Sequence, residues 1–111
     1  MTQLREIVVE VSDVDAAARF YVARGLHERR RGRWEAGPFV ALEDDDGVRL
    51  MLVEGDGGVR LALTVADAVG SLASAEADGA QRDADPSRGG GGTWAPARDP
   101  FGNAIGFWSR T

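Results

Sequence analysis

The chain has 111 residues, a formal net charge of −5, thirteen arginines with no lysine, and no cysteine. Its length suits one compact domain, the lack of cysteine excludes disulfides and thiolate metal sites, and the acidic balance argues against a nucleic-acid partner. The sequence opens without a basic, apolar leader, and its apolar runs are too short to cross a bilayer. We therefore expect a cytoplasmic protein with no membrane partner.

The first half of the sequence, about residues 4–54, predicts a strand, a helix and three further strands. Apolar and polar residues alternate over 4–11, which indicates a half-buried strand. Asp13 is suited to cap a helix, and Gly25 to end it, because glycine readily adopts the left-handed conformation found after a helix. The three further strands are expected at residues 29–35, 39–43 and 48–54.

The second half, about residues 59–109, repeats this pattern 54 positions further along the chain. Asp67 and Gly79 again bound a helix, as Asp13 and Gly25 do, and we expect its apolar face to be formed by Val69, Leu72, Ala73 and Ala77. Strands are expected at residues 59–65, 81–85, 93–98 and 104–109. The glycine-rich segment 87–92 should be a mobile loop, because ordering glycine is entropically costly.

The two copies predict an α+β fold made of two βαβββ modules within a single domain, residues 1–111. Each module should form a curved four-stranded sheet with its helix on the outer face, so that the two sheets surround a concave cavity.

Three motifs carry a resemblance to a known superfamily: the run from Asp13 to Tyr21, the pair Gly25-Leu26, and the turn Asp99-Pro100-Phe101-Gly102-Asn103. They resemble the vicinal oxygen chelate superfamily, which includes glyoxalase I, extradiol dioxygenases, methylmalonyl-CoA epimerase and bleomycin-resistance proteins. The resemblance covers nearly the whole chain and implies a homodimer. It does not fix a function, because this fold hosts many chemistries.

In the metal-dependent members each module supplies two ligands, and the resemblance places these positions at Glu6, Met51, Arg60 and Gly106. Arginine repels a cation, a thioether is too soft for a hard divalent ion, and glycine has no side chain. We therefore expect no metal, no other cofactor and no assignable catalytic residue. The chain is closest to the metal-free, drug-binding resistance type. A plain ion pair between Glu6 and Arg60 in the vacated site is an open alternative.

What remains is a cavity on the faces away from the helices. The candidate ligand-binding residues are Glu6, Glu10, Trp34, Phe39, Met51, Arg60, Thr64, Trp94 and Trp108. Each tryptophan fits the core or a dimer interface as well as it fits the cavity, and that alternative also stays open.

These features predict a binding protein that sequesters a hydrophobic or aromatic natural product, with the glycine-rich loop as a lid. A bleomycin-, mitomycin- or enediyne-like compound fits, and the net acidity favours a cationic ligand. The alternative is an enzyme of the same superfamily, an isomerase, lyase or dioxygenase-like protein with a non-standard or absent metal site.

Overall fold

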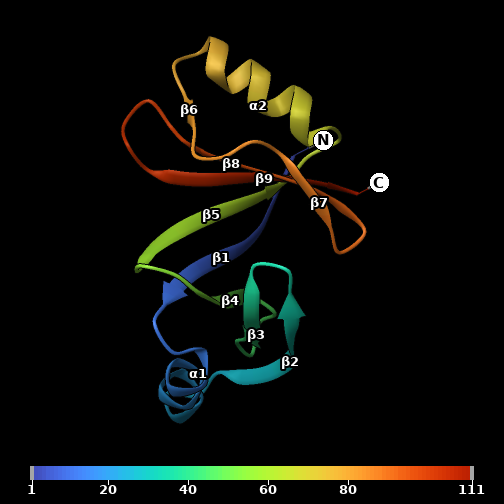
Figure 1. Cartoon of the computed structure of the whole chain (residues 1–111). Helices are drawn as coiled ribbons and strands as arrows, with labels where there is room; N and C mark the ends of the chain where they lie inside the picture. The colour runs from blue at the N-terminus through green and yellow to red at the C-terminus, as the bar shows by residue number, and fades with distance from the viewer. Residues whose placement is uncertain (1, 111) are drawn as a thin grey trace. The chain divides into compact units, whose positions relative to one another are not determined.

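The computed structural model describes residues 2–110, and it has a mixed α+β fold with two helices (Figure 1). The elements are β1 (Gln3–Val11), α1 (Val14–Ala23), β2 (His27–Trp34), β3 (Gly37–Glu43), β4 (Arg49–Glu54), β5 (Gly58–Thr64), α2 (Ala68–Ala77), β6 (Gln81–Arg82), β7 (Ser87–Gly89), β8 (Gly92–Arg98) and β9 (Ala104–Arg110). Two groups of residues pack internally: 6–59, called the first half below, and 2–5 with 60–110, called the second half. The grouping of both halves into one domain stays a prediction.

Both helices begin with the same capping geometry, as the repeat predicts. Asp13 has φ −144° and ψ 103°, and its carboxylate accepts a hydrogen bond from the Ala16 amide at 3.0 Å. Asp67 has φ −145° and ψ 104°, and accepts from the Gly70 amide at 3.1 Å. These bonds satisfy amide groups that a helix start leaves without an intrahelical partner.

In the first half, α1 packs on one face of a sheet with strand order β2–β3–β4–β1 (Figure 1). Parallel pairing of β1 with β4 and antiparallel pairing of β4 with β3 align Val9, Leu52 and Val40 in one row under the helix. The buried core consists of Val14, Ala18, Val40, Leu42 and Leu52. The alternation in the sequence thus predicts the side of this sheet that meets the helix.

In the second half, α2 packs on a sheet with strand order β5–β9–β8–β6, and β7 pairs with β8. The buried core consists of Val65, Ala68, Leu72, Ala95, Ala97 and Phe107. The predicted helix face is wrong in three of its four residues, since Val69, Ala73 and Ala77 are exposed. The helix begins at Ala68, so the stripe at helical spacing runs through Ala68, Leu72 and Ala75 instead. No helix within residues 2–110 has the length and apolar character to span a membrane.

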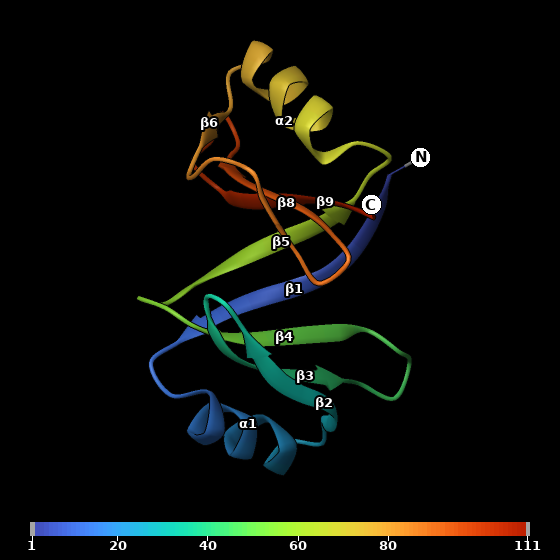
Figure 2. The same cartoon turned by 45° about the vertical axis from the view of Figure 1, so that its right-hand side comes forward.

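The glycine-rich segment is a hairpin rather than the predicted structureless loop (Figure 2). Ser87–Gly89 forms β7 and pairs with the start of β8. Gly90 and Gly91 have φ 60° and 82°, the positive values that a type I′ hairpin turn needs at both of its central positions. Glycine at these positions therefore permits the regular element, and a role of this hairpin as a lid stays a prediction.

Candidate functional site

The face of each sheet opposite its helix, called the helix-free face below, carries the nine predicted binding residues. In the first half, one row across the strands contains Glu10, Val53, Phe39 and Gly32, and Met51 lies in the next row. By the same alternation, Glu6 and Trp34 lie on this face. Their placement follows the predicted parity, and their role in ligand binding stays a prediction.

An aromatic stack covers part of the helix-free face in the first half. The Trp34 and Phe39 rings stack with centroids 4.0 Å apart and planes 18° apart, and the Arg30 guanidinium lies 5.2 Å from the Phe39 centroid. Phe39 is 4% exposed, whereas Trp34 is 39% exposed. The Phe39 ring also lies against Gly32, where an added Cβ would meet it at 3.0 Å. The Trp34 and Phe39 rings thus form an apolar aromatic surface with the Arg30 guanidinium beside it.

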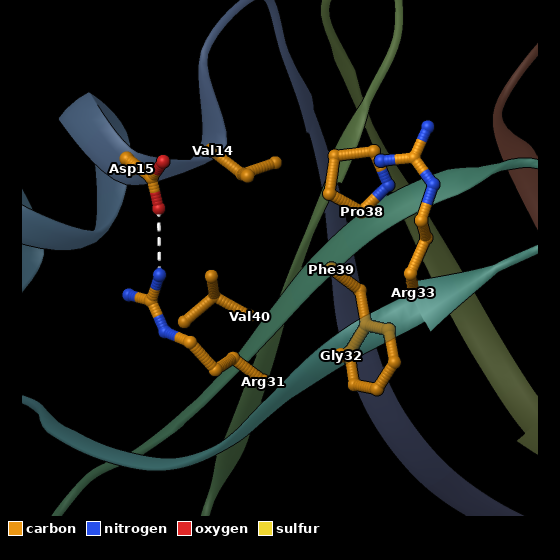
Figure 3. Close-up of a pocket in the computed structure, with 8 residues that line it drawn as sticks. All are labelled: Val14, Asp15, Arg31, Gly32, Arg33, Pro38, Phe39 and Val40. Atoms are coloured by element: carbon orange, nitrogen blue, oxygen red, sulfur yellow. Dashed lines mark hydrogen bonds and ion pairs between the residues drawn. The ribbon is translucent and has the colours of Figure 1, made fainter.

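A hollow of about 340 Å³ opens between the start of α1 and the β2–β3 hairpin (Figure 3). It is lined by Val14, Asp15, Arg31, Gly32, Arg33, Pro38, Phe39 and Val40, so Phe39 alone among the predicted residues borders it. Arg31 points to Asp15 and bonds it at 2.7 Å, and it also bonds Glu28 at 2.7 Å. The Arg31 hydrogen bond lowers the pKa of Glu28. The Arg31 charge is therefore already bound by two carboxylates, so we do not place the ligand in this hollow.

In the second half, two tryptophans lie flat across the β8–β9 pair. Trp94 and Trp108 are direct cross-strand partners. The Trp94 indole covers Gly106 on β9, and the Trp108 indole covers Gly92 on β8, so tightly that an added Cβ at either glycine would collide with the ring. We call these two rings the indole platform. Thr64 pairs with Trp108 from β5, next to the platform.

Arg60 is held inside the second half by a carboxylate that sequence reasoning missed. Its guanidinium donates to the Asp83 carboxylate at 2.7 Å and to the carbonyl oxygens of Ile105 and Ala97 at 2.6 and 3.1 Å. The Arg98 guanidinium lies 3.4 Å from the other Asp83 oxygen. The Arg60 hydrogen bond, helped by the charges of Arg60 and Arg98, lowers the pKa of Asp83. The predicted ion pair of Arg60 with Glu6 stays a prediction.

The four positions that the superfamily resemblance assigns to metal ligands do not fit a divalent cation. Arg60 is a fixed positive charge whose side chain is only 11% exposed, and it is bound to three oxygen atoms. The Trp94 ring occupies the space that a ligating side chain at Gly106 would need. Met51 is a buried thioether. Within residues 2–110, no three His, Cys, Asp or Glu side chains are grouped to hold a metal.

Residues 6–107 match the family model described as Glyoxalase-like domain. No curated protein matches the chain.

Solved structures with the same fold include proteins of different kinds. A hypothetical protein from Bacillus halodurans C-125 has a TM-score of 0.79 at 17% identity, over 99% of this chain and 95% of the other. A Streptomyces coelicolor methylmalonyl-CoA epimerase, in complex with 2-nitronate-propionyl-CoA, has a TM-score of 0.76 at 20% identity, over 100% and 96%. A member of the glyoxalase/bleomycin resistance protein/dioxygenase superfamily from Vibrio splendidus 12B01 has a TM-score of 0.66 at 21% identity, over 98% of this chain and 100% of the other. At these identities the likeness concerns the fold alone.

Proposed function

Because the chain belongs to the glyoxalase-like domain family, we propose that it is a small-molecule binding protein that sequesters a hydrophobic or aromatic natural product without using a metal. The observation that carries this proposal is the Trp94 indole over Gly106. At a position that the superfamily resemblance gives to a metal ligand, the chain presents a flat aromatic surface. Bleomycin-, mitomycin- and enediyne-like compounds are the candidate ligands, and their capture would protect a cell from a toxic compound.

The aromatic surfaces of the helix-free faces can supply the binding energy. Burial of apolar area contributes roughly 25 cal/mol per Å², so a planar ligand that covers about 200 Å² of apolar surface gains about 5 kcal/mol before the cost of association. Ring stacking adds about 0.5–1.5 kcal/mol per pair. Trp34, Trp94 and Trp108 keep exposed ring surface for this role. Phe39 and Met51 are buried on the same side of the first sheet, where Phe39 supports Trp34 in the stack and Met51 adds an adaptable side chain.

Tryptophan fluorescence tests the proposal directly. We expect titration with mitomycin-, bleomycin- or enediyne-like compounds to quench the tryptophan emission until the binding sites are saturated. Trp94→Leu should weaken the affinity about tenfold, because it removes a stacking surface. Phe101→Leu is the matched control, since Phe101 is 88% exposed in the turn before β9 and outside the proposed surfaces.

Protection in cells is the second readout. A host that expresses the chain should survive a higher concentration of the ligand found by fluorescence, and a host that expresses Trp94→Leu should not. Absence of quenching together with absence of protection across all three compound classes would contradict the proposal.

A second copy of the chain is part of the proposal, because the superfamily resemblance implies a homodimer. Sedimentation velocity at micromolar concentration should give the mass of two chains. A monomer at that concentration would remove the dimer from the proposal and leave the binding role standing.

An enzyme of the same superfamily is the second candidate, and the likeness to methylmalonyl-CoA epimerase favours it at the level of the fold. Metal analysis of the purified protein separates the two. Stoichiometric Zn, Ni, Mn or Fe, retained after dialysis, would favour the enzyme and overturn metal-free binding. Sub-stoichiometric metal that leaves ligand quenching unchanged supports the binding protein.

A further inference from the structure

We infer that the indole platform takes a flat aromatic anion, a ring system that carries a carboxylate or phenolate. This inference rests on the proposed function and narrows its ligand class. It departs from the cationic ligand that the net charge of the whole chain favours, because the charge next to the platform has the opposite sign.

The platform is built from two matched segments of sequence. Gly92-Thr93-Trp94 and Gly106-Phe107-Trp108 each place glycine two residues before tryptophan. Antiparallel pairing sets the two tryptophans opposite each other, so each indole leans over the glycine of the other strand. Both rings therefore lie flat on the sheet, and both tryptophans are only half-buried. A planar ligand is the shape that two partly exposed indoles, each packed over a glycine of the neighbouring strand, complement.

Arginines bound the platform along the β8–β9 pair. On the helix-free face the successive cross-strand pairs are Gly92 with Arg110, Trp94 with Trp108, Pro96 with Gly106, and Arg98 with Ala104. Arg110 thus follows the indoles at one end and Arg98 at the other. The Arg5 guanidinium lies 5.3 Å from a Trp108 ring centroid, so a cation already sits over one of the rings.

The local charge balance is positive even when Arg5 is left out. Among the described side chains of this half, Arg60, Arg98 and Arg110 lie on this face and Asp83 pairs with Arg60 and Arg98, which leaves an excess of two positive charges. The other acids of this half act elsewhere, as follows: Asp67 caps α2, Asp78 ends α2, Glu76 and Asp85 bond Arg82, and Asp99 accepts hydrogen bonds within its own turn. Guanidinium groups keep their charge at every physiological pH.

An aromatic anion uses both features at once. Its ring system stacks on the indoles, and its carboxylate or phenolate reaches a guanidinium at the platform's end, which is the group best shaped to bind a carboxylate through two hydrogen bonds. A cationic aromatic of the same shape stacks equally well but meets like charges, which is unfavourable.

A matched series of anthraquinones tests the inference by quenching of tryptophan fluorescence. The carboxylate, the neutral carboxamide and the aminomethyl cation share one ring system. We expect the carboxylate to bind at least about threefold more tightly than the carboxamide, the cation to bind most weakly, and the carboxylate's advantage to shrink at high salt. Equal or tighter binding of the carboxamide or the cation would overturn the inference and leave the proposed function intact. Absence of quenching by all three would overturn the inference, and the proposed function would fall with it only if the bleomycin-, mitomycin- and enediyne-like compounds also fail to bind and to be neutralised in cells.

Arginine variants locate the effect. Arg110→Gln and Arg98→Gln should each weaken carboxylate binding about threefold and leave carboxamide binding unchanged, so carboxamide affinity also reports that the platform is folded. Arg88→Gln is the matched control. Arg88 pairs with Thr93 in the same hairpin, on the parity opposite to the indoles, and its substitution should leave both affinities unchanged. The inference would be overturned if Arg110→Gln and Arg98→Gln bound the carboxylate no more weakly than Arg88→Gln does.

Discussion

The two halves begin alike and differ in how they fill the helix-free face. Their helix caps agree within about a degree in φ and ψ. In the first half, Phe39 lies over Gly32 and Trp34 stacks on it, with Arg30 at the edge. In the second half, Trp94 and Trp108 cover each other's glycines. The repeat therefore preserves the residues that start and end the helices. The side chains that cover the helix-free face differ between the halves, although an aromatic ring lies over a glycine in both.

The ring lies closer to the covered glycine in the second half than in the first, so substitution of that glycine by alanine should destabilise the protein more. Gly106→Ala should cost about 3 kcal/mol, because the new Cβ collides with the Trp94 ring. Gly32→Ala should cost about 1 kcal/mol, since Phe39 needs to move only slightly. Gly89→Ala is the control, because it has open space around it and should stay within about 0.5 kcal/mol of the parent. Urea unfolding measures all three, and equal costs for Gly106→Ala and Gly89→Ala would refute the platform geometry.

The buried cation distinguishes the second half from the first. Asp83→Asn should destabilise the protein by about 2 kcal/mol, because it leaves the mostly buried Arg60 guanidinium without its anion. Asp85→Asn, at a 90% exposed carboxylate that also bonds an arginine, should change stability by less than about 0.5 kcal/mol. Chemical denaturation of the two variants gives the comparison. A cost for Asp83→Asn no larger than for Asp85→Asn would mean that the ion pair contributes little.

The shared caps predict equal effects in the two halves. Asp13→Ala and Asp67→Ala should each cost about 1 kcal/mol, because each removes one side-chain acceptor from a helix start. Asp56→Ala, in the link between β4 and β5, should be neutral. Thermal unfolding of the three variants, compared at one pH, checks this expectation. Costs that differ several-fold between Asp13→Ala and Asp67→Ala would show that the halves do not depend equally on their caps.

The smallest expected effect is on acid stability. The pKa of Asp83 is lowered below its ordinary 3.8, chiefly by the Arg60 hydrogen bond. A lowered carboxyl pKa adds stability that is complete above the ordinary value and is lost as the pH falls through the folded-state value. The parent should therefore lose more stability than Asp83→Asn between about pH 7 and about pH 3. A stability difference that stays constant over this range, measured by urea midpoints, would contradict the assignment.

Local signals predicted much of the fold. Capping aspartates, helix-ending glycines and the alternation of residues in β1 and β5 depend on neighbours in sequence, so the mixed α+β fold and the parity of the strands were predictable. The apolar face of α2 was not. A helix rich in alanine has little contrast between its apolar and polar faces. Ala68 is buried in the cluster that contains Ala95 and Phe107, whereas Val69 is exposed.

The sequence predicted which residues lie on the helix-free faces, but it did not predict which side chains contact one another there. Arg60 and Trp94 were identified by their parity. Asp83 was missed because it follows a two-residue strand and is 23 residues from Arg60 in the sequence, so that only tertiary structure brings the two side chains into contact. One signal was present in the sequence. All three tryptophans follow a glycine by two positions, at Gly32, Gly92 and Gly106, the spacing that puts both residues on one face of a strand.

The sequence by itself determined where helices start and stop, which strand positions face the helices, and that arginine, methionine and glycine stand at the positions the superfamily resemblance gives to metal ligands. These features depend on residue type and short spacing. Tertiary structure alone decided which glycine each ring covers, which carboxylate holds Arg60, and that positive charge surrounds the indoles of an acidic chain. Strand register and side-chain direction bring those groups together from distant parts of the sequence, and neither can be read from local patterns.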